Sequence, residues 1–324
     1  MTKLLQYGVE LTRIAIERWQ QQQQRVSRED DDNNDNTSQS EVQAKYVVAS
    51  SGCYGAALAN GEEYTGNYPG MTVELLKEFH RKKAKALWDT NPDGLAIETI
   101  PTVDECRAVC EMLRELQEQE LKQNEEAEAS NIVSCAAGND GSGCCCWISL
   151  ACKNETELNN GQLLEEALQV IHEADPDVRF IHAIGLNCCD STYIPSLLQI
   201  LTSTMASQQI ANVSNEHACA NRRRGIVFYP NSGEEWDARE GAWKSNTGCT
   251  SSEDFAVRLV EAVDVVETTW KESYARAVDD PSAVPSRPRL VLGGCCRTTP
   301  DTIQVLRKFV DHRHLTQQQL HPDQ

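Results

Sequence analysis

The chain has 324 residues, and 49 acidic against 30 basic side chains give it a formal net charge of −19 at pH 7. A surface this acidic does not suit the phosphates of nucleic acid, so nucleic acid is excluded as an expected partner. Apolar residues make up 40% of the chain, which is enough for a hydrophobic core and excludes disorder along the whole length.

The sequence has no apolar run of the ~18–20 residues that a membrane span needs, and its start lacks the charged-then-apolar pattern of a secretory signal. We therefore expect a soluble cytoplasmic protein without membrane contact. Fourteen cysteines are present, several of them in adjacent runs rather than in the spaced pattern of a secreted disulfide scaffold. In a reducing compartment they are expected to be thiols or metal ligands.

The first predicted element is an amphipathic helix over residues 3–19, where apolar residues recur every three or four positions from Leu4 to Ile14. Residues 20–43 are rich in Gln, Asp and Asn. They are too polar to bury surface that would offset the entropy cost of ordering them, so a flexible loop is expected there.

From Tyr46 onward, short apolar runs alternate with helical stripes, which is typical of βα units around a parallel sheet. Strands are predicted at 46–53, 94–100, 145–151, 180–187, 224–229 and 288–294. Helices are predicted at 72–90, 102–121, 162–174, 194–206, 253–277 and 300–312, the last opening on a threonine cap followed by proline. Residues 117–143, first acidic and then rich in Gly and Ser, are expected to be a flexible surface insertion.

Two predicted strands end in cysteine, one at Cys188 and the other at Cys295 and Cys296. In a parallel barrel the ligand site lies where strands end, so these cysteines are expected to face one shared site. Cys188 and Cys295 are 107 residues apart, which fits no short zinc-finger spacing, so spacing alone leaves open that they are buried core thiols. Along an extended segment Cys189 points away from Cys188, so Cys188 is preferred and Cys189 is the second choice.

Five sets of motifs follow one another in a fixed order: Gly52-Cys53-Tyr54-Gly55-Ala56 with Gly61-Glu62-Glu63-Tyr64-Thr65-Gly66, then Glu98-Thr99-Ile100-Pro101, then Gly185-Leu186-Asn187-Cys188, then Tyr229-Pro230-Asn231-Ser232-Gly233-Glu234, and last Gly293-Gly294-Cys295-Cys296-Arg297-Thr298-Thr299-Pro300. Together they lie within the stretch 46–312, and they resemble the motifs of the homocysteine S-methyltransferase family, in its S-methylmethionine-using branch.

The resemblance implies a TIM-type (β/α)8 barrel, a single homocysteine-binding domain over 1–324, in which Cys188, Cys295 and Cys296 hold one zinc ion. Three protein ligands leave a fourth position open, where a substrate thiol is held as thiolate. The implied substrates are homocysteine and a sulfonium methyl donor, S-methylmethionine first and S-adenosylmethionine second. Because the donor leaves as a neutral thioether, no catalytic residue beyond the zinc-activated thiolate is expected.

Three further residues are candidates for substrate binding. Glu98 ends a predicted strand, where its carboxylate would pair with the ammonium group of an amino acid; the alternative is a structural carboxylate that caps the next helix. Asn187 and Asn231 also stand at strand ends, where they would orient substrate or backbone by hydrogen bonds. The alternative for both is a turn-forming role.

The chain departs from the family pattern at its start. The family's first strand, with an acidic residue before two glycines, and its second strand, rich in Thr, Ser and Gln, find no counterpart here. We therefore expect an incomplete barrel of about six strands, whose exposed edges favour self-association. Two other interpretations stay open: a catalytically inactive truncated homologue that binds zinc or a partner chain, and a non-catalytic chain with structural or unmetallated cysteines.

Overall fold

The computed structural model describes residues 2–31, 44–129, 145–213, 223–234, 236–237, 242–244, 247–249, 251–277 and 285–320. Six strands form one parallel sheet in the order β1-β2-β3-β4-β5-β8. They are β1 (Val48–Gly52), β2 (Gly94–Ile100), β3 (Cys145–Leu150), β4 (Ala183–Asn187), β5 (Gly225–Tyr229) and β8 (Leu290–Leu292). All six predicted strands are confirmed. A short antiparallel pair, β6 (Trp236–Asp237) and β7 (Ala242–Trp243), follows β5.

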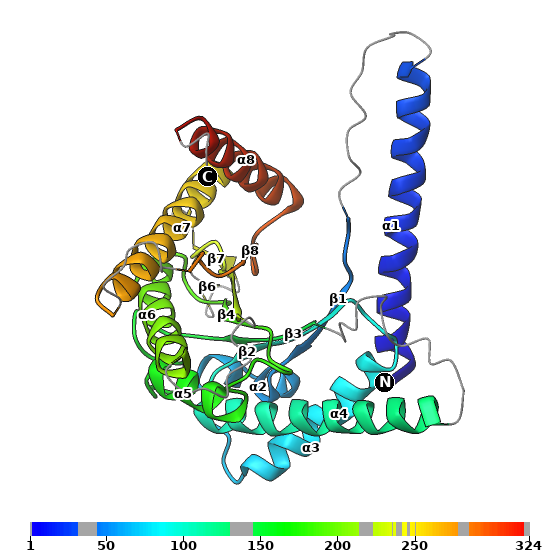
Figure 1. The fold of residues 1–324 in the computed structure, drawn as a ribbon, viewed down its shortest axis with the longest axis vertical. Helices are drawn as coiled ribbons and strands as arrows, with labels where there is room; N and C mark the ends of the chain where they lie inside the picture. Colours follow the sequence, from blue (N-terminus) through cyan, green and yellow to red (C-terminus); the bar gives the residue numbers. More distant parts are fainter. Residues whose placement is uncertain are drawn as a thin grey trace.

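Helices cover one side of the curved sheet and follow its strands around an arc, which stays open between α1 and α8 (Figure 1). They are α1 (Thr2–Asp31), α2 (Tyr54–Leu58), α3 (Val73–Trp88), α4 (Val103–Ala129), α5 (Leu164–Ala174), α6 (Ile194–Val213), α7 (Ser252–Ala275) and α8 (Pro300–Leu320), with a 3-10 turn η1 (Glu62–Tyr64) after α2. The seven predicted helices are confirmed in place, and α8 begins at the expected proline.

Two helices run further than the sequence pattern indicates. Helix α1 continues to Asp31, so residues 20–31 are helical where a loop is expected, and α4 continues to Ala129 into the expected insertion. Neither extension contains Gly or Pro, and their Gln, Glu, Arg and Lys residues are good helix formers. Polarity therefore does not exclude a helix here. Residues 32–43 and 130–144, the rest of the two expected insertions, lie outside the described residues.

The two faces of the sheet have different surroundings because successive side chains point in opposite directions. In β1, Ala49 and Ser51 are buried, whereas Val48 and Ser50 are exposed on the other face, here called the inner face. Strand β4 is held very close to β5: a Cβ on Gly185 would lie 1.7 Å from the carbonyl oxygen of Val227, so only glycine fits there. This close approach brings the ends of β4 and β5 together.

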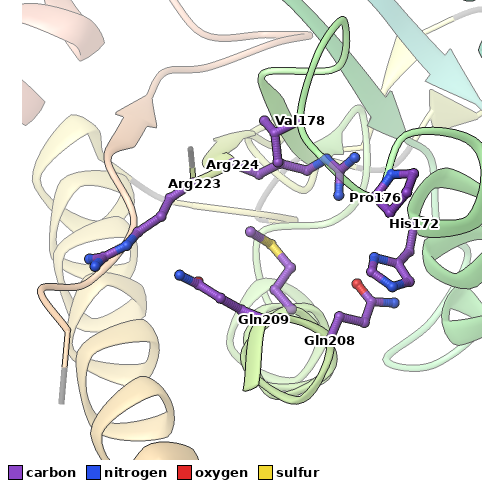
Figure 2. Close-up of a pocket in the computed structure, with 8 residues that line it drawn as sticks. His172, Pro176, Val178, Gln208, Gln209, Arg223 and Arg224 are labelled. Atoms are coloured by element: carbon purple, nitrogen blue, oxygen red, sulfur yellow. The ribbon is translucent and has the colours of Figure 1, made fainter. Parts of the chain in front are cut away.

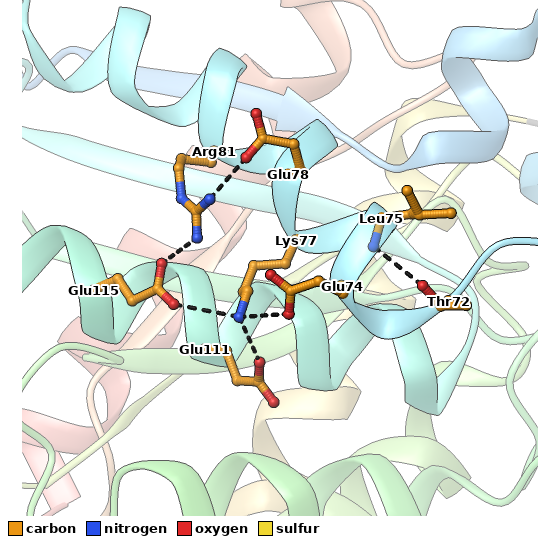
Figure 3. A network of polar contacts seen from close by, with 8 residues as sticks. All are labelled: Thr72, Glu74, Leu75, Lys77, Glu78, Arg81, Glu111 and Glu115. Carbon is orange, nitrogen blue, oxygen red and sulfur yellow. Dashed lines mark hydrogen bonds and ion pairs between the residues drawn. The ribbon is translucent and has the colours of Figure 1, made fainter.

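A network of charged side chains joins α3 to α4 (Figure 3). The Nζ atom of Lys77 contacts carboxylates of Glu74, Glu111 and Glu115 at 2.8, 3.1 and 3.3 Å. Arg81 also pairs with Glu115. Because the Lys77 side chain is only 11% exposed, these ion pairs are screened less than ordinary surface pairs. The network fixes two of the helices that support β1 and β2.

The sheet is open at both ends. Among the residues that the structure describes, β1 pairs with β2 alone and β8 with β5 alone, so each has a free edge. Closure of a TIM-type barrel takes eight strands, and six are present. The fold is therefore an incomplete barrel of this type, as expected. No helix in the described part of the chain is long and apolar enough to span a membrane.

Candidate active site

Three cysteine side chains meet at the carboxyl end of the sheet. Cys188 follows β4, and Cys295 and Cys296 follow β8. Their Sγ atoms all lie within 4.8 Å of one another, and the sulfurs of Cys188 and Cys296 are 3.9 Å apart. Cys189 is buried in the core, with 2% of its surface exposed, and is not part of this cluster. Residues 107 positions apart in the sequence thus form one group because parallel strands end at the same edge.

Local backbone geometry directs these side chains toward one another. Cys188 has φ +51°, in the left-handed region, so the chain turns sharply as it leaves β4. After β8, a tight turn is closed by the amide of Thr298, which donates to the carbonyl of Cys295 at 3.2 Å, and Arg297 within it has φ +66°. A Cβ on Gly294 would lie 2.5 Å from the Thr298 side chain, so glycine leaves room for this turn.

The loop after β5 supports the turn that carries Cys295 and Cys296. The amide of Cys295 donates to the carbonyl of Pro230 at 2.8 Å, and the amide of Ser232 donates to the carbonyl of Cys296 at 3.2 Å. Arg297 then donates two hydrogen bonds, of 2.8 and 3.0 Å, to the carboxylate of Glu234. Backbone pairing and a bidentate ion pair together hold the two segments in register.

The three sulfurs influence one another strongly. Hydrogen bonds from Cys188 and then Cys295 lower the pKa of Cys296 to about 3. The corresponding hydrogen bonds with Cys295 and Cys296, together with burial, raise the pKa of Cys188. Burial and then the cysteine sulfurs also raise the pKa of Tyr64, which puts its phenol within electrostatic reach of the cluster. The arrangement favours negative charge on one sulfur, shared through hydrogen bonds with the other two.

The donor set fits a zinc ion. Zinc binds thiolate sulfur at about 2.3 Å in tetrahedral geometry, which puts two sulfurs on one ion about 3.8 Å apart. The 3.9 Å between Cys188 and Cys296 is close to that value. Three soft sulfur ligands, with no fourth ligand in the cluster among the described residues, match the composition of catalytic rather than structural zinc sites.

Glu98 lies at the end of β2 among polar side chains of the inner face. Its Oε2 accepts a 2.9 Å hydrogen bond from the hydroxyl of Tyr229, and its Oε1 accepts one from Ser50. The indole nitrogen of Trp147 donates to the Tyr229 oxygen at 3.2 Å. Glu98 is half-buried and does not cap the helix that follows β2, where Thr102 accepts from the amide of Glu105 at 3.0 Å.

The two asparagines make hydrogen bonds within the protein. Asn187 is 1% exposed; its Oδ1 accepts from the amide of Thr99 at 2.8 Å and its Nδ2 donates to the Thr99 hydroxyl at 2.7 Å. The Oδ1 of Asn231 accepts from the amide of Gly233 at 2.9 Å, which is an Asx turn. Each asparagine supports the loops beside the cysteines, the role given above as the alternative to substrate contact.

Sequence reasoning left out several residues of this site. Tyr229 and Glu234 belong to one recognised motif and Arg297 to another, but their partners follow only from the fold. Trp147 and Ser50 belong to no such motif. Strand alternation is the signal that would have found them, because Ser50, Trp147 and Glu98 point to the same face once the register of β1, β2 and β3 is known.

Among the described residues, the remaining cysteines lie outside this cluster. Six of them are buried in the core: Cys53, Cys106, Cys110, Cys146, Cys152 and Cys189. Cys144 lies outside the described residues.

A small polar pocket lies at the opposite end of the strands from the cysteines, where β5 begins. Figure 2 shows the side chains that line it. It is lined by the end of α5, the second half of α6 and the start of β5, with His172, Gln208 and Arg224 among its residues. Arg224 is buried and donates to the carbonyl of Ile181 at 3.1 Å. In a parallel barrel this end of the sheet serves stability, so we assign no substrate to the pocket.

Comparison with known proteins finds methyltransferases that cover most of the chain. A selenocysteine methyltransferase from Astragalus bisulcatus is 31% identical over 308 residues, which is 95% of this chain and 70% of that protein. Homocysteine S-methyltransferase 1 from Arabidopsis thaliana is 28% identical over 312 residues, covering 96% and 71%.

Solved structures share the fold. The homocysteine methyltransferase MmuM from Escherichia coli, in its oxidised form, superposes with a TM-score of 0.56 at 23% identity, covering 95% of this chain and 70% of that one. Its metallated form gives 0.55 at 22% identity. The sequence profile of the family described as homocysteine S-methyltransferase matches residues 1–310. The chain therefore belongs to the homocysteine S-methyltransferase family of enzymes.

Proposed function

We propose that this protein transfers a methyl group from a sulfonium donor to the sulfur of L-homocysteine and so forms methionine. S-methylmethionine is the favoured donor and S-adenosylmethionine the second. The observation that carries the proposal is the meeting of three cysteine sulfurs within 4.8 Å at the carboxyl end of the sheet, in a chain of this family.

Cys188, Cys295 and Cys296 are the residues that would hold a zinc ion. When bound, zinc would supply a fourth coordination position that lowers the pKa of a substrate thiol. Support comes from the donor set and from the E. coli relative, which has been solved in a metallated form. The turns after β4 and β8 bring the three sulfurs together, and the Arg297–Glu234 pair holds the second turn in place.

The remaining chemistry needs little from the protein. The methyl group leaves a sulfonium sulfur, which becomes a neutral thioether, so no side chain has to protonate the leaving group. The new bond forms at the homocysteine sulfur, and the thiol proton passes to solvent. Glu98, with an acceptor position open on each oxygen, would bind the ammonium group of the amino acid and orient its thiol toward the cysteines.

The decisive experiment measures zinc per chain on purified protein, wild type beside Cys188→Ser and Cys295→Ser. We expect about one zinc in the wild type and loss of most of it in both variants, because each removes a ligand. Cys249→Ser is the matched control, since this half-buried cysteine lies outside the cluster and should leave zinc content unchanged. Equal zinc content in all four proteins would refute the assignment of the ligands.

Activity is then measured as methionine formed from homocysteine with each donor. L-selenocysteine serves as a second acceptor, because one relative is a selenocysteine methyltransferase. If the protein binds zinc but turns over no combination of methyl donor and acceptor, the inactive homologue that binds metal or a partner chain would be favoured. Absence of zinc together with absence of turnover would favour structural cysteines.

A further inference from the structure

Four strands of the sheet contribute side chains to a single hydrogen-bonded group on its inner face. Ser50 comes from β1, Glu98 from β2, Trp147 from β3 and Tyr229 from β5. Tyr229 donates to Glu98 at 2.9 Å, and Trp147 donates to Tyr229 at 3.2 Å. The Glu98 carboxylate is therefore held directly from β1 and β5 and, through Tyr229, from β3, which restricts its rotamers.

The direction of the Tyr229 proton follows from its neighbours. An indole nitrogen is only a donor, so Trp147 occupies a lone pair of the tyrosine oxygen and cannot accept its proton. The proton of Tyr229 therefore points to Glu98, the acceptor on its other side. Burial and then the Glu98 carboxylate raise the pKa of Tyr229, so the phenol keeps its proton over the physiological range.

The backbone directly after Glu98 is unusual. The pairing of β2 with β3 shifts register between Ile97 and Ile100, which is a bulge, and Thr99 inside it has φ +64°. Asn187 satisfies the amide of Thr99 from the end of β4 at 2.8 Å. Glu98 itself keeps the regular β1–β2 register, opposite Gly52, so it points to the inner face by strand alternation, and the bulge at Thr99 follows directly after it.

We propose that Tyr229, backed by Trp147, is a positioning residue that fixes Glu98 as the receptor for the substrate ammonium group and so makes the enzyme selective for thiols that carry an amino group. The inference rests on the proposed function. Among the described residues, Oε1 of Glu98 has one donor, Ser50, and Oε2 has one donor, Tyr229. Each carboxylate oxygen can accept two hydrogen bonds. One acceptor position per oxygen thus remains for an ammonium group.

Selectivity depends on this fixation. A mobile Glu98 would still attract an ammonium group, but the group would have to immobilise the carboxylate on binding, which weakens affinity. A thiol without an amino group gains nothing from Glu98 in either case. Loss of the Tyr229 hydroxyl is therefore expected to reduce affinity for amino-acid thiols alone.

The test compares binding of L-homocysteine and of 4-mercaptobutanoate, which is homocysteine without its amino group, to zinc-loaded protein by titration calorimetry. In Tyr229→Phe we expect affinity for homocysteine to fall about tenfold or more, the size of a lost hydrogen bond to a charged group, and affinity for 4-mercaptobutanoate to stay the same. Tyr274→Phe is the matched control, because it removes a buried hydroxyl in α7, away from the site.

Trp147→Phe separates positioning from general packing. It should weaken homocysteine binding less than Tyr229→Phe does, and it should add nothing in the Tyr229→Phe background, because its effect passes through the tyrosine. In the assay of methionine formation, KM for homocysteine should rise more than kcat falls. Both variants keep an aromatic ring, so folding is checked by near-UV circular dichroism.

The outcomes distinguish this inference from the function on which it rests. Absence of homocysteine binding by the wild type overturns the proposed function and the positioning role together. Equal homocysteine affinity in wild type and Tyr229→Phe overturns only the positioning role. Equal weakening for both ligands also overturns it, since the tyrosine would then shape the site rather than aim Glu98.

Discussion

At the level of single residues, the contact between Arg297 and Glu234 is the side-chain link between the cysteine turn and the neighbouring loop. Arg297 directly follows Cys296 and has a left-handed backbone, and its guanidinium donates to both oxygens of Glu234. Glu234 also accepts from the Ser232 hydroxyl at 2.8 Å. These hydrogen bonds lower the pKa of Glu234, so the pair stays charged at neutral pH.

We predict that Glu234→Gln weakens zinc binding by about tenfold, the lower end of what partners of metal ligands contribute. The reason is that the amide cannot form the bidentate ion pair, so the turn that carries Cys295 and Cys296 becomes mobile. Competition with a chromophoric chelator measures the affinity. Asp311→Asn is the control, because it breaks an exposed arginine pair on α8, far from the turn in sequence. Equal zinc affinity in wild type and Glu234→Gln would contradict the prediction.

At the level of elements, Asp175 joins the end of α5 to β4. Its carboxylate is 2% exposed and accepts from the amides of Arg179, Phe180 and Ile181 at 2.7, 3.0 and 2.8 Å. It also pairs with the buried Arg224 at 3.5 Å. One side chain thus supplies acceptors for three successive amides in the segment that leads from α5 into β4.

Asp175→Ala is expected to lower the free energy of unfolding by about 3 kcal/mol or more, since it removes the counter-charge of a buried arginine and leaves three amides without their acceptor. Asp175→Asn keeps one acceptor oxygen, so it should lower the free energy of unfolding by less than Asp175→Ala does. Urea denaturation followed by circular dichroism measures both. Stabilities that differ from wild type by less than about 1 kcal/mol would mean that water replaces the carboxylate.

The network between α3 and α4 gives a pH dependence of stability. Burial of Glu115 opposes its ionisation, but hydrogen bonds from Arg81 and Lys77 outweigh this and lower its pKa. A lowered folded-state pKa adds stability above the unfolded value of about 4.3, and that stability is lost as pH falls through the folded value. Between about pH 5 and about pH 3, wild type should therefore lose more stability than Glu115→Gln. If the free energy of unfolding falls equally with pH in wild type and in Glu115→Gln, the network is not the cause of the pH dependence.

At the level of the whole molecule, the open sheet is the dominant feature. In the described part of the chain, β1 and β8 each leave one row of backbone groups unpaired, and exposed apolar side chains accompany both edges. Free strand edges pair with other chains unless charge or cover prevents it. We propose that the protein self-associates through these edges.

Val291 in β8 is 51% exposed, and Val291→Lys should raise the monomer fraction measured by gel filtration with light scattering. Val257→Lys on α7 is the matched control, because this valine is 40% exposed but lies away from the sheet edge. An identical oligomer distribution in wild type and Val291→Lys would place the association elsewhere.

The sequence by itself determined the six βα units, because strands and helices follow from local apolar periodicity. It also singled out Cys188, Cys295, Cys296 and Glu98 through recognisable motifs. It misjudged the ends of α1 and α4, because polarity resembles a loop while helix propensity acts over the same residues.

Only the tertiary structure decided which side chains meet. The parallel order of the strands brings Cys188 to the turn after β8, and the close approach at Gly185 draws β4 against β5. The bulge at Thr99 gives Asn187 a structural partner, and the register of the sheet brings Glu98 to Tyr229. These contacts join residues that are distant in the chain, so their geometry depends on sheet register and twist, which no local pattern encodes.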